Sequence, residues 1–152
     1  MPMEKKTALG LTGEKIVRNF LLEKGFVVTD TLNVYDSDKD FDATYKNKTY
    51  TVEVKTQVPF VIKESFTIRE EQSRKCFSVD MLIFVCVPPS KPFPYGGQIF
   101  KVNPKQVKTK PHTTKDGRKM ILIPINQPAV KSIKKLTSEE ISLLNKSKST
   151  DY

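Results

Sequence analysis

The residues from Asp40 to Gln57, DFDATYKNKTYTVEVKTQ, alternate polar and apolar side chains along two short segments. This alternation is typical of half-buried β-strands, because successive side chains of a strand point to opposite faces. Between the segments, Asn47 and Lys48 are the residues that we expect to form a two-residue turn. The stretch therefore predicts a β-hairpin with one apolar face and one polar face.

The polar face of this hairpin brings two acids and a lysine together. With the turn placed as above, Asp42 lies opposite Glu53, and Asp40 lies opposite Lys55. Like charges directly opposite one another are destabilising unless a cation lies between them, and clustered carboxylate oxygens are the ligands of hard divalent cations. We therefore expect Asp42 and Glu53 to form half of a metal site. Gln57 shares this face, and it either lines the site or is an exposed strand end.

A helix that carries a glutamate is expected before the hairpin. Residues 12–24 have helical periodicity, with Thr12 as a candidate N-cap. Glu14 would then lie in the first turn, where it could simply complement the helix dipole. It is also spaced three and seven residues from Val17 and Leu21, which places it in line with the core-facing stripe. Both interpretations of Glu14 remain open at this point.

An Asp on one strand, Glu-x-Lys on the next, and a Glu-bearing helix before them resemble the pattern of the PD-(D/E)xK nuclease superfamily. The resemblance covers roughly residues 10–107, is closest to the homing endonuclease branch, and lacks the proline that gives the motif its name. It implies an α/β fold in which a mixed central sheet is flanked by helices. It also implies a Mg²⁺ cofactor, for which Mn²⁺ can substitute. The site that we expect has Asp42 and Glu53 as metal ligands, with Lys55, Glu14 and Gln57 completing the catalytic set.

Length and charge limit the possible classes of protein. The 152 residues suffice for one domain with a core and are too few for two. We expect a single domain over residues 1–152, with its core at about residues 10–125. The net charge of +9 favours a polyanionic partner, for which DNA is the natural candidate.

Cysteine and hydropathy patterns indicate the compartment. Cys76 and Cys86 are too few for a disulfide framework and too far apart for a C-x-x-C site, so we expect buried thiols in a reducing cytoplasm. No apolar run is long enough to span a bilayer, and the first residues do not resemble a signal peptide. The sequence therefore predicts a cytoplasmic protein that makes no use of a membrane.

The most basic part of the chain is residues 101–119, which we call the basic segment. Its interior carries Pro111, two threonines and Asp116-Gly117, a composition that predicts a long loop or the tip of a ribbon. Residues 119–125 are expected to return as a strand. We expect seven cations of the segment to contact DNA phosphates: Lys101, Lys105, Lys108, Lys110, Lys115, Arg118 and Lys119.

The remaining elements are expected to complete a mixed sheet. Thr67 and Glu70 form a capping-box pattern that predicts a helix over residues 67–76. Residues 80–87 are a continuous apolar run, which suits a strand buried on both faces, and residues 98–102 form a further short strand. A final helix and tail are expected at residues 137–152. Asp36 and Asp38 lie in a polar loop and are either solvated or close to the metal face.

These observations favour a metal-dependent DNA endonuclease that hydrolyses phosphodiester bonds. Homing enzymes, phage or mobile-element nucleases and Holliday junction resolvases all fit the size of the chain. A nucleic-acid-binding module that retains the fold without catalysis is the alternative, and in it Asp40 and Lys55 form an ordinary cross-strand ion pair. Cutting both strands with one site per chain would require at least a homodimer.

Overall fold

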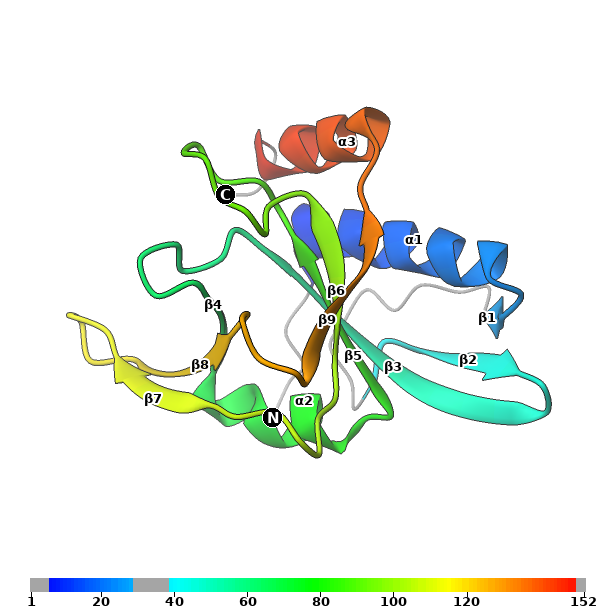
Figure 1. The fold of residues 1–152 in the computed structure, drawn as a ribbon, viewed down its shortest axis with the longest axis horizontal. Coiled ribbons are helices and arrows are strands. Elements are labelled where there is room, and N and C mark those ends of the chain that lie inside the picture. The colour runs from blue at the N-terminus through cyan, green and yellow to red at the C-terminus, as the bar shows by residue number, and fades with distance from the viewer. Residues whose placement is uncertain (1–5, 29–38, 150–152) are drawn as a thin grey trace.

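The computed structural model describes residues 6–28 and 39–149, so Asp36, Asp38 and the last residues of the tail lie outside the described part of the chain. The chain is arranged in three layers (Figure 1). Helices α1 and α3 cover one face of a six-stranded sheet, and a three-stranded sheet and helix α2 pack on the other. The elements are α1 (Ala8–Glu23), β1 (Val27–Val28), β2 (Phe41–Tyr45), β3 (Lys48–Gln57), β4 (Ser65–Arg69), the short 3-10 helix η1 (Glu70–Gln72), α2 (Ser73–Ser78), β5 (Met81–Cys86), β6 (Gln98–Val102), β7 (Lys110–Thr113), β8 (Lys119–Pro124), β9 (Val130–Lys135) and α3 (Ser138–Ser149).

The larger sheet has the strand order β1-β2-β3-β5-β6-β9, in which β3 and β5 are parallel and the other neighbours are antiparallel. The smaller sheet has the order β4-β8-β7 and is antiparallel throughout. The prediction of an α/β protein with a mixed sheet and flanking helices is therefore confirmed. None of the described helices combines the length and the apolar character that crossing a membrane requires.

Strand β5 lies at the centre of the fold, and all of its side chains are buried. Met81, Ile83 and Val85 point toward the helices α1 and α3, whereas Leu82 and Phe84 point toward the smaller sheet. This confirms the prediction of a strand that is buried on both faces. Both cysteine thiols are also free and buried, and burial raises their pKa, to about 11 in Cys76 and about 12 in Cys86.

Helix α1 begins earlier than the sequence pattern predicts. Its N-cap is Thr7, whose side chain accepts a hydrogen bond from the backbone N–H of Gly10 at 3.0 Å, so the expected cap at Thr12 is wrong. Glu14 consequently lies beyond the first turn, where the helix dipole has little effect on a charge. The dipole interpretation of Glu14 therefore no longer explains its position.

The hairpin of β2 and β3 forms as predicted, but its turn is shifted by one residue. Lys46 and Asn47 make the turn with φ of 49° and 65°, the left-handed conformation that a tight hairpin turn requires at both central residues. Asp42 therefore lies opposite Thr51 and not opposite Glu53. Because the shift moves the pairing by two residues, each side chain keeps the face that the alternation predicts.

Three further segments differ from the predictions or extend them. Thr67 lies within strand β4 and does not cap a helix, because Phe66 and Ile68 on either side of it are buried against β5. The basic segment forms the end of β6, a turn, and the ribbon of β7 and β8, as a ribbon tip was expected. The final helix is confirmed, with the Thr137 hydroxyl accepting from the backbone N–H of Glu140 at 3.1 Å.

Candidate functional site

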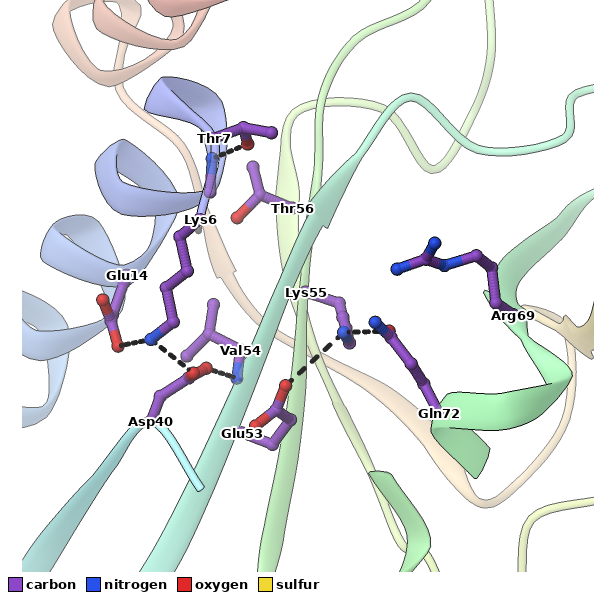
Figure 2. A pocket seen from close by; sticks show the side chains of 11 residues that line it. Lys6, Thr7, Glu14, Asp40, Glu53, Val54, Lys55, Thr56, Arg69 and Gln72 are labelled. Atoms are coloured by element: carbon purple, nitrogen blue, oxygen red, sulfur yellow. Dashed lines mark hydrogen bonds and ion pairs between the residues drawn. The ribbon is translucent and has the colours of Figure 1, made fainter. Parts of the chain in front are cut away.

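A pocket of about 230 Å³ opens where β2 separates from β3, between the first residues of α1 and η1 (Figure 2). Three acids, two lysines and an arginine are among the side chains that surround it. The lining residues are Lys6, Thr7, Gly10, Glu14, Asp40, Glu53, Val54, Lys55, Thr56, Arg69 and Gln72.

The pocket exists because β2 covers only part of the edge of β3. The last backbone pairing is that of Phe41 with Val52, and the N–H of Asp40 donates to the carbonyl of Val52 at 2.8 Å. Two residues further along β3, the N–H of Val54 donates to Oδ2 of Asp40 at 2.6 Å. The Asp40 carboxylate therefore takes the place of a strand partner and is fixed by the sheet itself, with only 2% of the residue exposed.

Burial makes ionisation of the Glu53 carboxylate costly. It is 1% exposed, and its Oε2 lies 3.5 Å from Lys55 Nζ and 3.3 Å from Lys75 Nζ. Burial, and next the charge of Asp40, raise the pKa of Glu53 to about 7 in spite of these two ammonium groups. Oε1 of Glu53 has no hydrogen-bond partner in the described part of the chain. An additional cation at this oxygen would favour the ionised carboxylate.

Lys6 holds the other two acids together. Its Nζ lies 2.7 Å from Oδ1 of Asp40 and 3.1 Å from Oε1 of Glu14, and its side chain is 8% exposed. Burial alone would lower the pKa of Lys6, but the contacts with Asp40 and Glu14 outweigh burial, so this pKa is raised. Burial, followed by the charge of Asp40, raises the pKa of Glu14. Lys6 was not predicted, because it precedes the first periodic segment of the sequence and no pattern assigns it a face.

Lys55 lies beside Glu53 in the pocket, as the Glu-x-Lys spacing predicts. Its Nζ donates to Oε1 of Gln72 at 2.6 Å, and its side chain is 18% exposed. Gln72 and Arg69 come from η1 and the end of β4, and their side chains extend toward the pocket from the side opposite Glu14 (Figure 2). The pocket therefore has buried carboxylates on one side and donors of hydrogen bonds on the other.

Two predicted site residues lie elsewhere. The Asp42 side chain is 31% exposed and pairs with Lys39 at 2.8 Å, and Asp40 occupies the position in the pocket that we expected for Asp42. The Gln57 side chain donates to the carbonyl of Thr67 and accepts from the N–H of the same residue, both at 2.8 Å. Gln57 thus joins β3 to β4 and does not belong to the described lining of the pocket. The position of Asp42 follows from the strand register, in which it lies opposite Thr51. Gln57 is instead held by its side-chain hydrogen bonds to the backbone of Thr67, a contact that the local sequence does not indicate.

The seven cations of the basic segment are all exposed, and the described lining of the pocket includes none of them. They follow the end of β6 and the ribbon of β7 and β8, which projects from the body of the protein (Figure 1). In the smaller sheet, Arg69 pairs with Met120, which in turn pairs with His112. The turn between β7 and β8 therefore follows directly after the end of the smaller sheet that also carries Arg69.

Residues 6–28 and 39–149 contain no group of three or more His, Cys, Asp or Glu side chains whose present positions could hold a metal ion. The chemistry of the donors nevertheless fits a hard divalent cation, because Oε2 of Glu14 and Oε1 of Glu53 are buried oxygens without hydrogen-bond partners among the described residues. The ammonium group of Lys6 lies between two of these acids, Glu14 and Asp40.

Comparison with known proteins finds no match: no family model, no curated protein and no solved structure is significantly similar to this chain.

Proposed function

We propose that the protein is a metal-dependent endodeoxyribonuclease with a PD-(D/E)xK type of core, using Mg²⁺ or Mn²⁺. The observation that supports this proposal is that Glu14, Asp40, Glu53 and Lys55, from three separate segments, line one pocket. Asp40 replaces Asp42 as the acid of the first strand, so that the motif becomes Asp40 followed by Glu53-Val-Lys55. The acids and the lysine keep the order along the chain on which the resemblance rests.

In this proposal the three acids hold the cation and Lys55 acts on the substrate. A bound divalent cation would neutralise charge on the scissile phosphate and lower the pKa of an attacking water. Glu14 and Glu53 each offer a buried oxygen that has no hydrogen-bond partner among the described residues, and the sheet fixes Asp40 between them. Gln72 holds the ammonium group of Lys55 in the pocket, and the Lys55 side chain is 18% exposed, so it can stabilise negative charge that develops on the phosphate.

DNA is the proposed substrate because the cationic groups lie outside the pocket as well as in it. Arg69 faces the pocket, and the exposed lysines of the basic segment can neutralise phosphates along a duplex. If each chain contributes one such site, cleavage of both strands requires two copies, so we propose that the active form is at least a homodimer.

One observation favours the second candidate, a nucleic-acid-binding module of the same fold without catalysis. The ammonium group of Lys6 already forms ion pairs with both Glu14 and Asp40 without any metal. In a binding module these contacts would be permanent, and the pocket would only stabilise the fold.

Cleavage assays with two matched variants test the proposal. Purified protein is incubated with supercoiled, linear and branched DNA, each with Mg²⁺ and with chelator. We expect Mg²⁺-dependent cleavage that is lost in Asp40→Asn and retained in Asp42→Asn, because only the first residue lies in the pocket. Cleavage confined to branched DNA would identify a junction resolvase, and DNA binding without cleavage would identify the binding module. Loss of activity in Asp42→Asn alone would contradict the site described above.

A further inference from the structure

A lysine lies among acids in the candidate cation site. Lys6 Nζ contacts Asp40 Oδ1 at 2.7 Å and Glu14 Oε1 at 3.1 Å, and these two acids are 2% and 1% exposed. The ammonium group therefore occupies the space between two buried carboxylates, where water cannot stabilise either charge. In Figure 2 the side chain extends from the start of α1 down toward Asp40.

Each of the three acids of the pocket already contacts an ammonium group without a metal. Three lysines contact the three acids through ion pairs of 2.7 to 3.5 Å: Lys6 with Glu14 and Asp40, and Lys55 and Lys75 with Glu53. A divalent cation added to this arrangement would bring two uncompensated positive charges close to an ammonium group that is almost fully buried. The oxygens of Asp40 also already contact Lys6 Nζ and the N–H of Val54. A divalent cation that takes Asp40 Oδ1 or Glu14 Oε1 as a ligand must therefore displace the ammonium group of Lys6.

We propose that Lys6 is a tethered competitor of the divalent cation, which binds to Glu14 and Asp40 only when the ammonium group of Lys6 leaves them. This inference rests on the proposed function. Lys6 precedes the N-cap Thr7, and the hydrogen bond from Gly10 to the Thr7 side chain does not involve Lys6. The lysine side chain can therefore swing out of the pocket while helix α1 keeps its cap.

The released ammonium group needs a new anionic partner, and a DNA phosphate at the mouth of the pocket would supply one. The cation and DNA would then each favour binding of the other, because thermodynamic coupling between two ligands is reciprocal. Without DNA the cation should bind weakly, since it has to displace an internal cation. Lys6 would thus limit metal loading to the complex with substrate.

Calorimetric titration of Mg²⁺ into the full chain tests this proposal. Lys6→Met retains much of the length of the side chain but removes the competing charge, and we expect it to bind Mg²⁺ at least about tenfold more tightly than wild type. Lys39→Met is the matched control, because Lys39 makes a similar ion pair with Asp42 outside the pocket, and its affinity should equal that of wild type. Equal or weaker binding by a folded Lys6→Met variant overturns the proposal.

A measurement on the wild type keeps the proposal testable if Lys6→Met does not fold. An amine-reactive acetylating reagent should modify Lys6 slowly in chelator, because its side chain is 8% exposed, and several-fold faster at saturating Mg²⁺. Peptide mass spectrometry reports this rate for Lys6 and, as a reference, for exposed Lys105. Saturable Mg²⁺ binding with an unchanged rate at Lys6 would overturn the competition.

The outcomes also separate this inference from the proposed function. If wild type and Lys6→Met bind Mg²⁺ equally well, Lys6 is no competitor, but a metal-dependent nuclease remains possible. If the variant binds Mg²⁺ more tightly and the wild type cleaves no DNA, the competition is correct and the nuclease is not. If neither protein binds Mg²⁺ or Mn²⁺, both proposals fail.

Discussion

The raised pKa of Glu53 predicts that this acid destabilises the folded protein at neutral and alkaline pH in the absence of a divalent cation. The ordinary value of 4.5 applies to the unfolded chain, and burial raises the folded value to about 7. Between these two values the folded protein binds more protons than the unfolded chain, so its stability falls as the pH rises. The difference between 4.5 and about 7 corresponds to about 3 kcal/mol of the free energy of unfolding. The folded protein has this contribution at acidic pH and loses it once the pH exceeds the folded pKa of Glu53.

The Glu53→Gln variant tests this reasoning, because glutamine has nearly the same shape and no proton to lose. We expect the free energy of unfolding of the variant, relative to wild type, to increase by about 3 kcal/mol between pH 4.5 and pH 8. Urea denaturation in chelator at several pH values, followed by circular dichroism, measures this difference. A constant difference for Glu53→Gln would refute the argument, and so would a wild type that gains stability relative to the variant as the pH rises.

Three further predictions concern packing, catalysis and DNA binding. In Gly13→Ala, the added Cβ would lie 1.8 Å from Thr56 Oγ1, so urea denaturation should show a decrease in stability of about 1–3 kcal/mol. Gly10→Ala is the control and should be less destabilised, because its Cβ meets only a side-chain oxygen at 3.2 Å. Lys55→Met should slow single-turnover cleavage about 100- to 1000-fold while DNA affinity in Ca²⁺ changes less than about tenfold, and near wild-type cleavage would remove its catalytic role. Replacing the lysines between residues 105 and 110 by Gln should reduce the log–log salt slope of DNA binding by about 0.9 for each phosphate that the variant no longer neutralises, and an unchanged slope would exclude the basic segment from the interface.

The hairpin shows which part of a site local sequence can predict. Alternation of polar and apolar residues gave the correct faces, and this prediction tolerates a shift of the turn by one residue, because the pairing then moves by two. The register itself depends on which residues adopt left-handed backbone angles. Lys46 and Asn47 do so, although the chain offers no glycine here and Lys is not a residue that favours this conformation. The acid that enters the pocket is consequently Asp40 and not Asp42.

Other differences arise from contacts between distant segments. The capping-box pattern at Thr67 is a local signal for a helix, but pairing of β4 with β8 and burial of Phe66 determine the outcome. Strand β9, which was not predicted, is an edge strand with few buried side chains and three lysines, a composition without a clear hydrophobic period. Lys6 enters the pocket only because α1 begins at Ala8, which no pattern near Lys6 indicates.

In a cation site, removing the charge of a buried acid should raise the stability of the metal-free protein and lower its affinity for the cation. These opposite effects distinguish a cation site from a structural cluster of ion pairs. In a structural cluster, replacing Glu53 by glutamine would remove favourable pairs with Lys55 and Lys75 and lower the stability at pH 8. In a cation site, the same change removes a buried charge that the two lysines compensate only in part without a divalent cation, so it should raise the stability of the metal-free protein and weaken Mg²⁺ binding. The raised pKa of Glu53 shows that the two lysines compensate its burial only in part. The sign of the stability change at pH 8, measured together with Mg²⁺ affinity, therefore discriminates between the two explanations.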